Sequence, residues 1–195
     1  GWLIAAIAIG MSLYQPVISL ALGAFPLAIL GLLLSLFFQA PYSPQSTLSR
    51  GAELHILLST LAYSLLTIAA AQAVLLAIQD RHLRLHKRSI LNNLPPLQTM
   101  ERLLFSHVII GFILLTLAIL TGFLTLEDMF AQHVAHKTVL TLASWLVFAI
   151  LLGGRYWLGW RGRTAIRFTM WGFVLLVVGF YGSKIVLELV LHQPV

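Results

Sequence analysis

Long stretches without a charged residue constrain this chain more than any other feature. Residues 1–49 contain no Asp, Glu, Lys or Arg, and only 9% of the 195 residues are charged, whereas 59% are hydrophobic. A soluble domain has about 25% charged residues. A helix that crosses a bilayer needs about 20 mainly apolar residues, and it satisfies its own backbone hydrogen bonds in lipid. The composition therefore predicts a membrane protein.

The charge-free intervals divide the chain into helical segments. Gln15-Pro16 interrupts the first interval because proline lacks a backbone N–H, and residues 2–14 are too short to cross alone. We expect spans at Leu20–Phe38, Leu54–Gln79, Leu103–Leu126, Thr138–Gly154 and Phe168–Ser183. The prediction is an all-α, polytopic transmembrane helical bundle of about six helical segments, forming one integral-membrane domain over 1–195. Because the chain starts at Gly1 without a charged flank, we expect further N-terminal spans to be missing from it.

The basic residues predict the orientation. Nine of the twelve lysines and arginines lie in the connections 80–102 and 155–167, which places both on the cytoplasmic side. Loops 39–53 and 125–135 and the C-terminus are then periplasmic. Because the basic clusters directly flank spans, we interpret them as topology determinants and contacts to lipid headgroups, and expect no nucleic-acid partner.

The chain has no cysteine, so any metal or heme iron must be bound mainly by histidine. His55, Ser59 and Tyr63 follow one another at four-residue steps, which places them on one stripe of the third span. A polar stripe in a membrane helix faces protein or water rather than lipid. Two roles remain open for His55: an iron ligand, or an interfacial side chain hydrogen-bonded to a neighbouring helix.

A second polar stripe closes the last span. Lys184, Glu188 and His192 also recur every four residues, within an arc of about 80° on a helix. Charged residues inside a membrane span are candidates for function. The alternative is an ion pair between Lys184 and Glu188 that neutralises itself, with His192 at the interface.

The loop before the fifth span offers weaker metal ligands. His133 and His136 stand three residues apart and would share a face if the segment is helical. Zinc takes three or four firmly placed ligands, so the pair alone favours a polar, solvated loop over a metal site. Lys137 follows, and we expect it to extend to the lipid headgroups.

Three short motifs carry a resemblance. The segments LPPLQTMERL, GWRGR and FYGSK, within residues 50–192, resemble the CcsA-like cytochrome c assembly family, and within it the YpjD-type inner-membrane branch. The resemblance implies that heme is handled at the outer membrane face between two histidines, which match His55 and His192. It also shows departures: the loop 125–135 has no tryptophan, and Gly153 replaces an intramembrane histidine although Arg155 remains.

The resemblance leads us to expect a heme-handling, cytochrome c assembly-like protein of the bacterial inner membrane. His55 and His192 would be axial ligands of heme iron, and Lys184 or Arg50 would meet the propionates. Without the tryptophans, the apolar surface for the porphyrin would come from four side chains of this region: Phe123, Leu126, Met129 and Phe130.

The expected partners are the lipid bilayer and either an apocytochrome or another membrane protein. We do not expect independent catalytic activity. The alternative function is a non-catalytic scaffold or transporter-partner subunit that has lost heme chemistry. Such a subunit would pack against its partner through a face of small residues: Ala69, Ala70, Ala71 and Ala73.

Overall fold

The computed structural model describes Ala6 and residues 50–85, 96–125 and 135–189, with side chains from Lys137 to Gly179 in the last stretch. In these ranges it contains the helices α3 (Arg50–Arg84), α4 (Leu97–Thr125), α5 (Ala135–Leu158) and α6 (Arg163–Leu189). The all-α prediction is therefore confirmed for the described part of the chain. Apart from Ala6, the predicted segments 2–14 and Leu20–Phe38 lie outside it, so the structure does not show six helical segments.

The helices extend beyond the predicted spans. Helix α3 continues to Arg84 and α4 already begins at Leu97, so both ends of the predicted connection 80–102 are helical. Helix α5 runs to Leu158 and α6 starts at Arg163, which shortens the predicted connection 155–167 to a four-residue turn. Charge marks where a helix leaves the lipid, but an α-helix continues into the interface while its charged side chains find partners.

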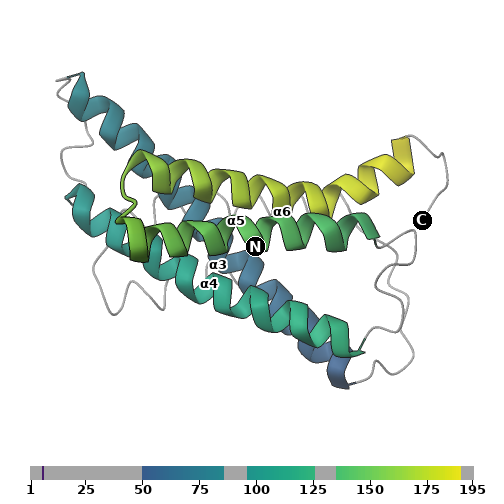
Figure 1. Ribbon diagram of the computed structural model, residues 1–195. Coiled ribbons are helices and arrows are strands. Elements are labelled where there is room, and N and C mark those ends of the chain that lie inside the picture. The colour runs from purple at the N-terminus through teal and green to yellow at the C-terminus, as the bar shows by residue number, and fades with distance from the viewer. Residues whose placement is uncertain (1–5, 7–49, 86–95, 126–134, 190–195) are drawn as a thin grey trace.

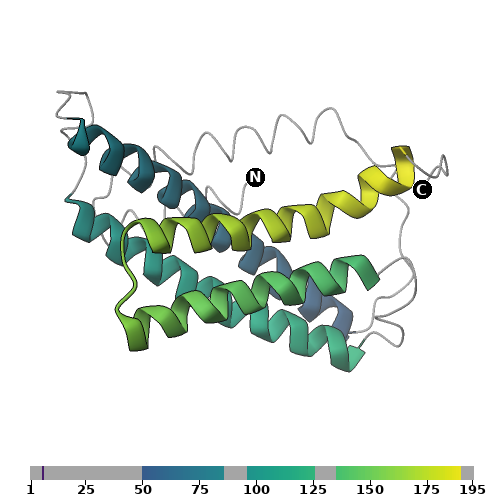
Figure 2. The ribbon, with the colours of Figure 1, turned by 45° about the horizontal axis from the view of Figure 1, so that its top comes forward.

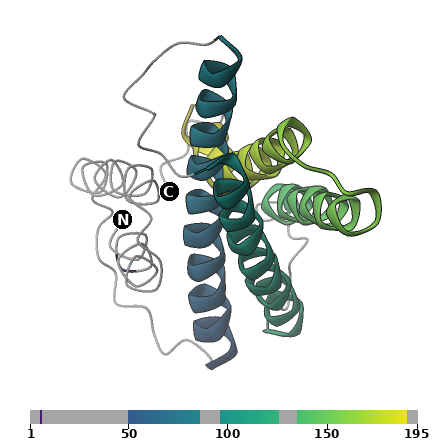
Figure 3. The same cartoon turned by 90° about the vertical axis from the view of Figure 1, so that its left-hand side faces the viewer.

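The four helices form two antiparallel hairpins that meet at one end and diverge toward the other. Figure 1 shows the pair α3–α4 crossing the pair α5–α6, with the end of α5 and the start of α6 near the first turns of α4, while the last turns of α3 project beyond them. The same divergence is visible after a rotation (Figure 2), and Figure 3 looks along the molecule from the closed end. The open end lies near the beginning of α3 and of α5.

Small residues bring α3 and α4 together. Ala62, Ala69, Ala73 and Val108 are fully buried, and a Cβ atom on Gly111 would lie only 2.8 Å from the side chain of Leu66. Close backbone approach at small residues is the usual way in which membrane helices associate. The alanines that the sequence offered for a partner protein are largely used within the chain, since Ala70 is also only 4% exposed.

The second hairpin packs in a similar way. The ring of Phe148 covers Gly172, and the Ser144 hydroxyl donates a hydrogen bond of 2.7 Å to the Gly172 carbonyl. Trp145 links this hairpin to α4, because its ring stacks on Phe112 at 5.6 Å and its Nε1–H donates to Thr116 Oγ1 at 2.9 Å. The two hairpins are thus held together at mid-length by specific contacts.

A buried carboxylate holds the closed end. Glu101 of α4 accepts hydrogen bonds from Arg155 at 2.8 Å, from Arg161 at 3.0 Å and from the backbone N–H of Gly162 at 3.3 Å. Gly159 and Gly162 have φ values of 65° and 53°, a left-handed conformation that glycine adopts without steric cost. Two of the motifs that carry the resemblance therefore meet here, since Glu101 belongs to LPPLQTMERL and the turn contains GWRGR.

The outer surfaces of the helices suit a lipid environment. Helices α3, α4 and the part of α5 from Lys137 to Leu158 are long and apolar enough to cross a membrane. Exposed apolar side chains line α4 along one face: Ile109, Ile110, Ile113, Leu117, Leu120 and Leu124. The described chain is therefore a multi-pass membrane protein.

Candidate functional site

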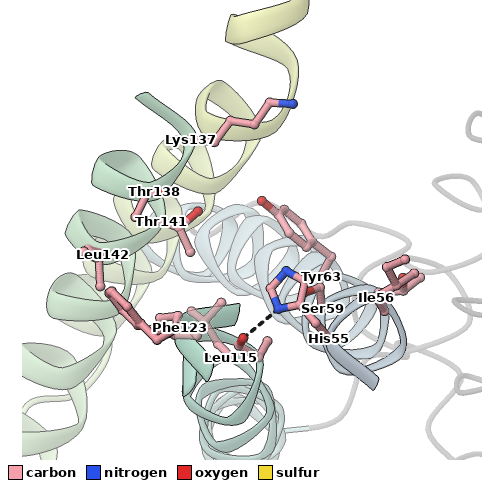
Figure 4. Close-up of a pocket in the computed structure, with 13 residues that line it drawn as sticks. His55, Ile56, Ser59, Tyr63, Leu115, Phe123, Lys137, Thr138, Thr141 and Leu142 are labelled. Carbon is pink, nitrogen blue, oxygen red and sulfur yellow. Dashed lines mark hydrogen bonds between the residues drawn. The ribbon is translucent and has the colours of Figure 1, made fainter. Parts of the chain in front are cut away.

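A cavity of about 420 Å³ occupies the open end, between the two hairpins. It is lined by α3, α4 and α5: His55, Ile56, Ser59, Thr60, Tyr63, Leu115, Ala118, Ile119, Phe123, Lys137, Thr138, Thr141 and Leu142. Sites for small molecules typically have volumes of about 300–1,000 Å³, largely apolar walls and a few polar groups. This cavity fits that description, and Figure 4 shows its lining.

The polar stripe predicted on the third span lines this cavity. His55, Ser59 and Tyr63 all project from α3 into it, because residues four apart lie above one another on a helix. The Tyr63 hydroxyl also reaches across to α6, where it donates a hydrogen bond of 3.4 Å to the Leu176 carbonyl. The stripe faces protein, as the sequence predicted.

A hydrogen bond orients the ring of His55. Its Nδ1 lies 2.8 Å from the Ala118 carbonyl oxygen of α4. A carbonyl only accepts, so Nδ1 carries the proton and donates it. In the neutral ring, Nε2 then holds the free lone pair, and this nitrogen points away from α4 toward the space between α3 and α5 (Figure 4). Metal-binding histidines commonly have their second nitrogen held in this way.

The cavity has one cation in its described lining. Lys137 lies near the start of α5, on the hairpin opposite His55, together with Thr138 and Thr141. Two of the three threonine hydroxyls of the lining come from this side of the cavity. The sequence predicts that Lys137 extends to the lipid headgroups; in the structure its side chain is exposed and also lines the cavity (Figure 4).

Of the four side chains expected to support a porphyrin, Phe123 is described, and it lines the cavity. The other walls that are purely apolar come from α4 and α5, at Leu115, Ile119 and Leu142. The aromatic surface that the resemblance would draw from tryptophans is thus reduced to Phe123 and the ring of Tyr63 in the described lining.

Other predicted site residues are not brought to the cavity by the described structure. Arg50 begins α3 and is exposed, and it is not part of the lining. Lys184 lies in α6 and His136 in α5, but their side chains are outside the described ones. His133 and His192 lie outside the described residues. Within the described ranges, no cluster of three or more His, Cys, Asp or Glu residues could bind a metal ion.

Reasoning from the sequence missed Lys137, Thr138 and Thr141 as one group. Their spacing contains a signal, because residues 137, 138 and 141 share a helix face at steps of three and four. It was hidden because a lysine at the end of a span is ordinarily explained by the headgroups. Only the divergence of the hairpins turns that face toward His55.

Helices that cross a membrane and diverge around a cavity at one end define a multi-pass membrane protein with an internal cavity. The family model described as cytochrome C assembly protein matches residues 2–191, and the chain belongs to this family. No solved structure matches the chain.

Three relatives illustrate the range of similarity. The chain is 36% identical over 166 residues to the inner membrane protein YpjD of Escherichia coli (strain K12), covering 85% of this chain and 63% of that protein. It is 34% identical over 149 residues to a 28.8 kDa protein of Azospirillum brasilense, covering 71% and 52%. It is 31% identical over 87 residues to the cytochrome c biogenesis protein CcsA of Mesostigma viride, covering 44% and 28%. The chain thus spans less than two thirds of the length of these relatives.

Proposed function

We propose that this chain is a heme-handling protein of cytochrome c assembly in the bacterial inner membrane, and that it binds heme in the cavity between the hairpins. The observation that carries the proposal is the orientation of His55. Its Nδ1–H is held by the Ala118 carbonyl at 2.8 Å, and Nε2 is left for a ligand on the cavity side. The comparisons support the class, since the family and the CcsA relative are named for cytochrome c assembly and biogenesis.

The residues of the cavity fit heme in three respects. His55 offers a neutral imidazole nitrogen, the apolar side chains suit a porphyrin face, and Lys137 offers a positive charge for a carboxylate. Bound heme would supply an iron that accepts axial nitrogen ligands. His192 remains the proposed second axial ligand, and His133 and His136 remain a weaker proposed metal-binding pair. We place the cavity end and the loops 39–53 and 125–135 on the periplasmic side.

The test is heme binding by the purified, detergent-solubilised chain. We expect a Soret band typical of histidine-ligated heme. His55→Ala should lower heme affinity by about tenfold or more, because even changes to groups that only orient a ligand cost ten- to a hundredfold. The double variant His55→Ala with His192→Ala should abolish the band.

His82→Ala is the matched control, because His82 lies near the opposite end of α3, outside the cavity. It should retain the Soret band of the unchanged chain. If the unchanged chain gains no Soret band on reconstitution with heme, the proposal is wrong, and a scaffold or transporter-partner role becomes the better explanation. A band that is equally strong in His55→Ala and in the unchanged chain would remove His55 from the site.

A further inference from the structure

Lys137 has an exposed side chain that is also part of the cavity lining. It lines the cavity from α5, while His55 lines it from α3, so the two groups belong to different hairpins. A lysine that only contacted headgroups would extend along the lipid-facing surface of its helix. Here the exposed side chain also borders the cavity, next to Thr138, which is only 7% exposed (Figure 4).

Lys137 forms no ion pair with an Asp or Glu within the described part of the chain. The described lining of the cavity contains no Asp or Glu. The ion pairs among described residues all lie at the closed end, where Glu101 and Asp80 bind arginines. A positive charge at an apolar cavity favours a ligand that has an anionic group.

The cavity is also divided into an apolar and a polar part. Leu115, Ile119 and Phe123 of α4 form an apolar wall, whereas Lys137, Thr138 and Thr141 of α5 carry an ammonium group and two hydroxyls. A ligand that satisfies both parts has a broad apolar body with an acidic group at its edge. Ammonium groups bind carboxylates through charge-assisted hydrogen bonds.

We propose that Lys137 binds a carboxylate of the ligand in this cavity, so that the site selects apolar macrocycles with a free acid group. For heme, this carboxylate is a propionate. The inference rests on the proposed function and deepens it: it assigns to Lys137 the role that the sequence gave to Lys184 or Arg50. Of these two alternatives, Arg50 is described and lies outside the cavity lining.

The test compares heme with heme dimethyl ester, in which both propionates are esterified and uncharged. Both probes are titrated into the purified, detergent-solubilised chain and followed by their Soret bands. We expect the unchanged chain to bind heme about two- to fivefold more tightly than the ester, the upper part of the range for an exposed ion pair. Lys137→Met, which keeps an unbranched side chain but removes the charge, should bind both probes equally.

Two control variants separate charge at this position from charge in general. Lys137→Arg should keep part of the preference for heme that Lys137→Met loses, because the cation is retained. Arg50→Met should keep the full preference, since Arg50 is a cation near the same end of the molecule but outside the lining. In all three variants the Soret band should still depend on His55.

The outcomes distinguish this inference from the proposed function. If the unchanged chain binds heme through His55 but binds the ester equally well, the role of Lys137 is wrong and the proposed function stands. An unchanged preference in Lys137→Met, or a loss of preference in Arg50→Met, also overturns the inference. If the Soret band disappears in Lys137→Met, the lysine is needed for the fold of the site and not for selectivity. If the unchanged chain binds neither probe, both proposals fail.

Discussion

Gly154 shows how a single residue shapes the closed end. Trp160 donates its backbone N–H to the Gly154 carbonyl at 3.1 Å, and its ring lies against Phe168 with centroids 4.9 Å apart. A Cβ atom on Gly154 would overlap the ring of Trp160. The chain folds back at this point because the missing side chain leaves room for the indole.

Gly154→Ala should therefore lower the free energy of unfolding by about 1–3 kcal/mol, the usual effect of adding a methyl group to a packed site. Thermal unfolding in detergent, followed by tryptophan fluorescence, measures the change. The control is Gly153, where a Cβ atom would lie 3.3 Å from the ring of Trp157.

Trp157 is 83% exposed and can move, so Gly153→Ala should be neutral or stabilise the helix by up to about 1 kcal/mol. Equal destabilisation by Gly153→Ala and Gly154→Ala would contradict the packing described here.

At the scale of the elements, α4 positions the other hairpin through Glu101. This side chain binds two guanidinium groups and the backbone N–H of Gly162, directly before α6, where a negative charge is favoured by the helix dipole. Arg155 is held further by the Phe105 ring, 4.5 Å from its Cζ atom, and by the Trp160 carbonyl at 3.1 Å. Together with the mid-length contacts of Trp145 to α4, this anchor holds the hairpins together on the side of the cavity away from the open end.

Glu101→Gln should destabilise the chain by about 1–3 kcal/mol, because a buried carboxylate that accepts several hydrogen bonds loses its charge. The side chain of Glu101 is only 11% exposed, so water cannot replace its partners. The same thermal unfolding experiment measures this change.

Asp80→Asn serves as the matched control, since Asp80 also binds two arginines, Arg84 and Arg163, both at 3.1 Å. These partners are 59% and 61% exposed, and such pairs contribute less than about 1 kcal/mol. A larger loss from Asp80→Asn than from Glu101→Gln would show that the anchor lies between α3 and α6 instead.

At the scale of the whole molecule, the two ends differ in charge. The closed end carries the arginine-rich turn between α5 and α6 and the basic end of α3, and the open end carries the cavity. The distribution of basic residues predicts that the closed end is cytoplasmic. That residues 1–195 form one integral-membrane domain also stays a prediction.

The lack of native cysteine allows this orientation to be tested with single cysteine variants. Gln98→Cys marks the closed end and Glu53→Cys the open end, and both side chains are exposed. A membrane-impermeant maleimide should label Glu53→Cys in intact spheroplasts but Gln98→Cys only after lysis. The reverse pattern would place the cavity on the cytoplasmic side.

The sequence predicted the spans of α3, α4 and α5 because the physics behind them is local. The bilayer requires about 20 apolar residues and internally satisfied backbone groups, so a charge-free interval predicts a helix without knowledge of its neighbours. The same locality identified the stripe of His55, Ser59 and Tyr63, since residues four apart share a face in any helix. The helix ends were less well predicted: α4 starts at Leu97, and the partners that allow Glu101 to be buried lie 54 and 60 residues away.

Only the tertiary structure decided what these faces meet. It joined LPPLQTMERL to GWRGR through Glu101, and it separated the hairpins at the other end so that Lys137 lies at a cavity with His55. Helices α3 and α4 approach closely at Gly111, and α5 and α6 at Gly172. These close contacts set the angles at which the helices cross, and the crossing angles determine where the helices diverge. Residue types and helical spacing are encoded locally, whereas a cavity is formed by side chains from three helices that no spacing relates.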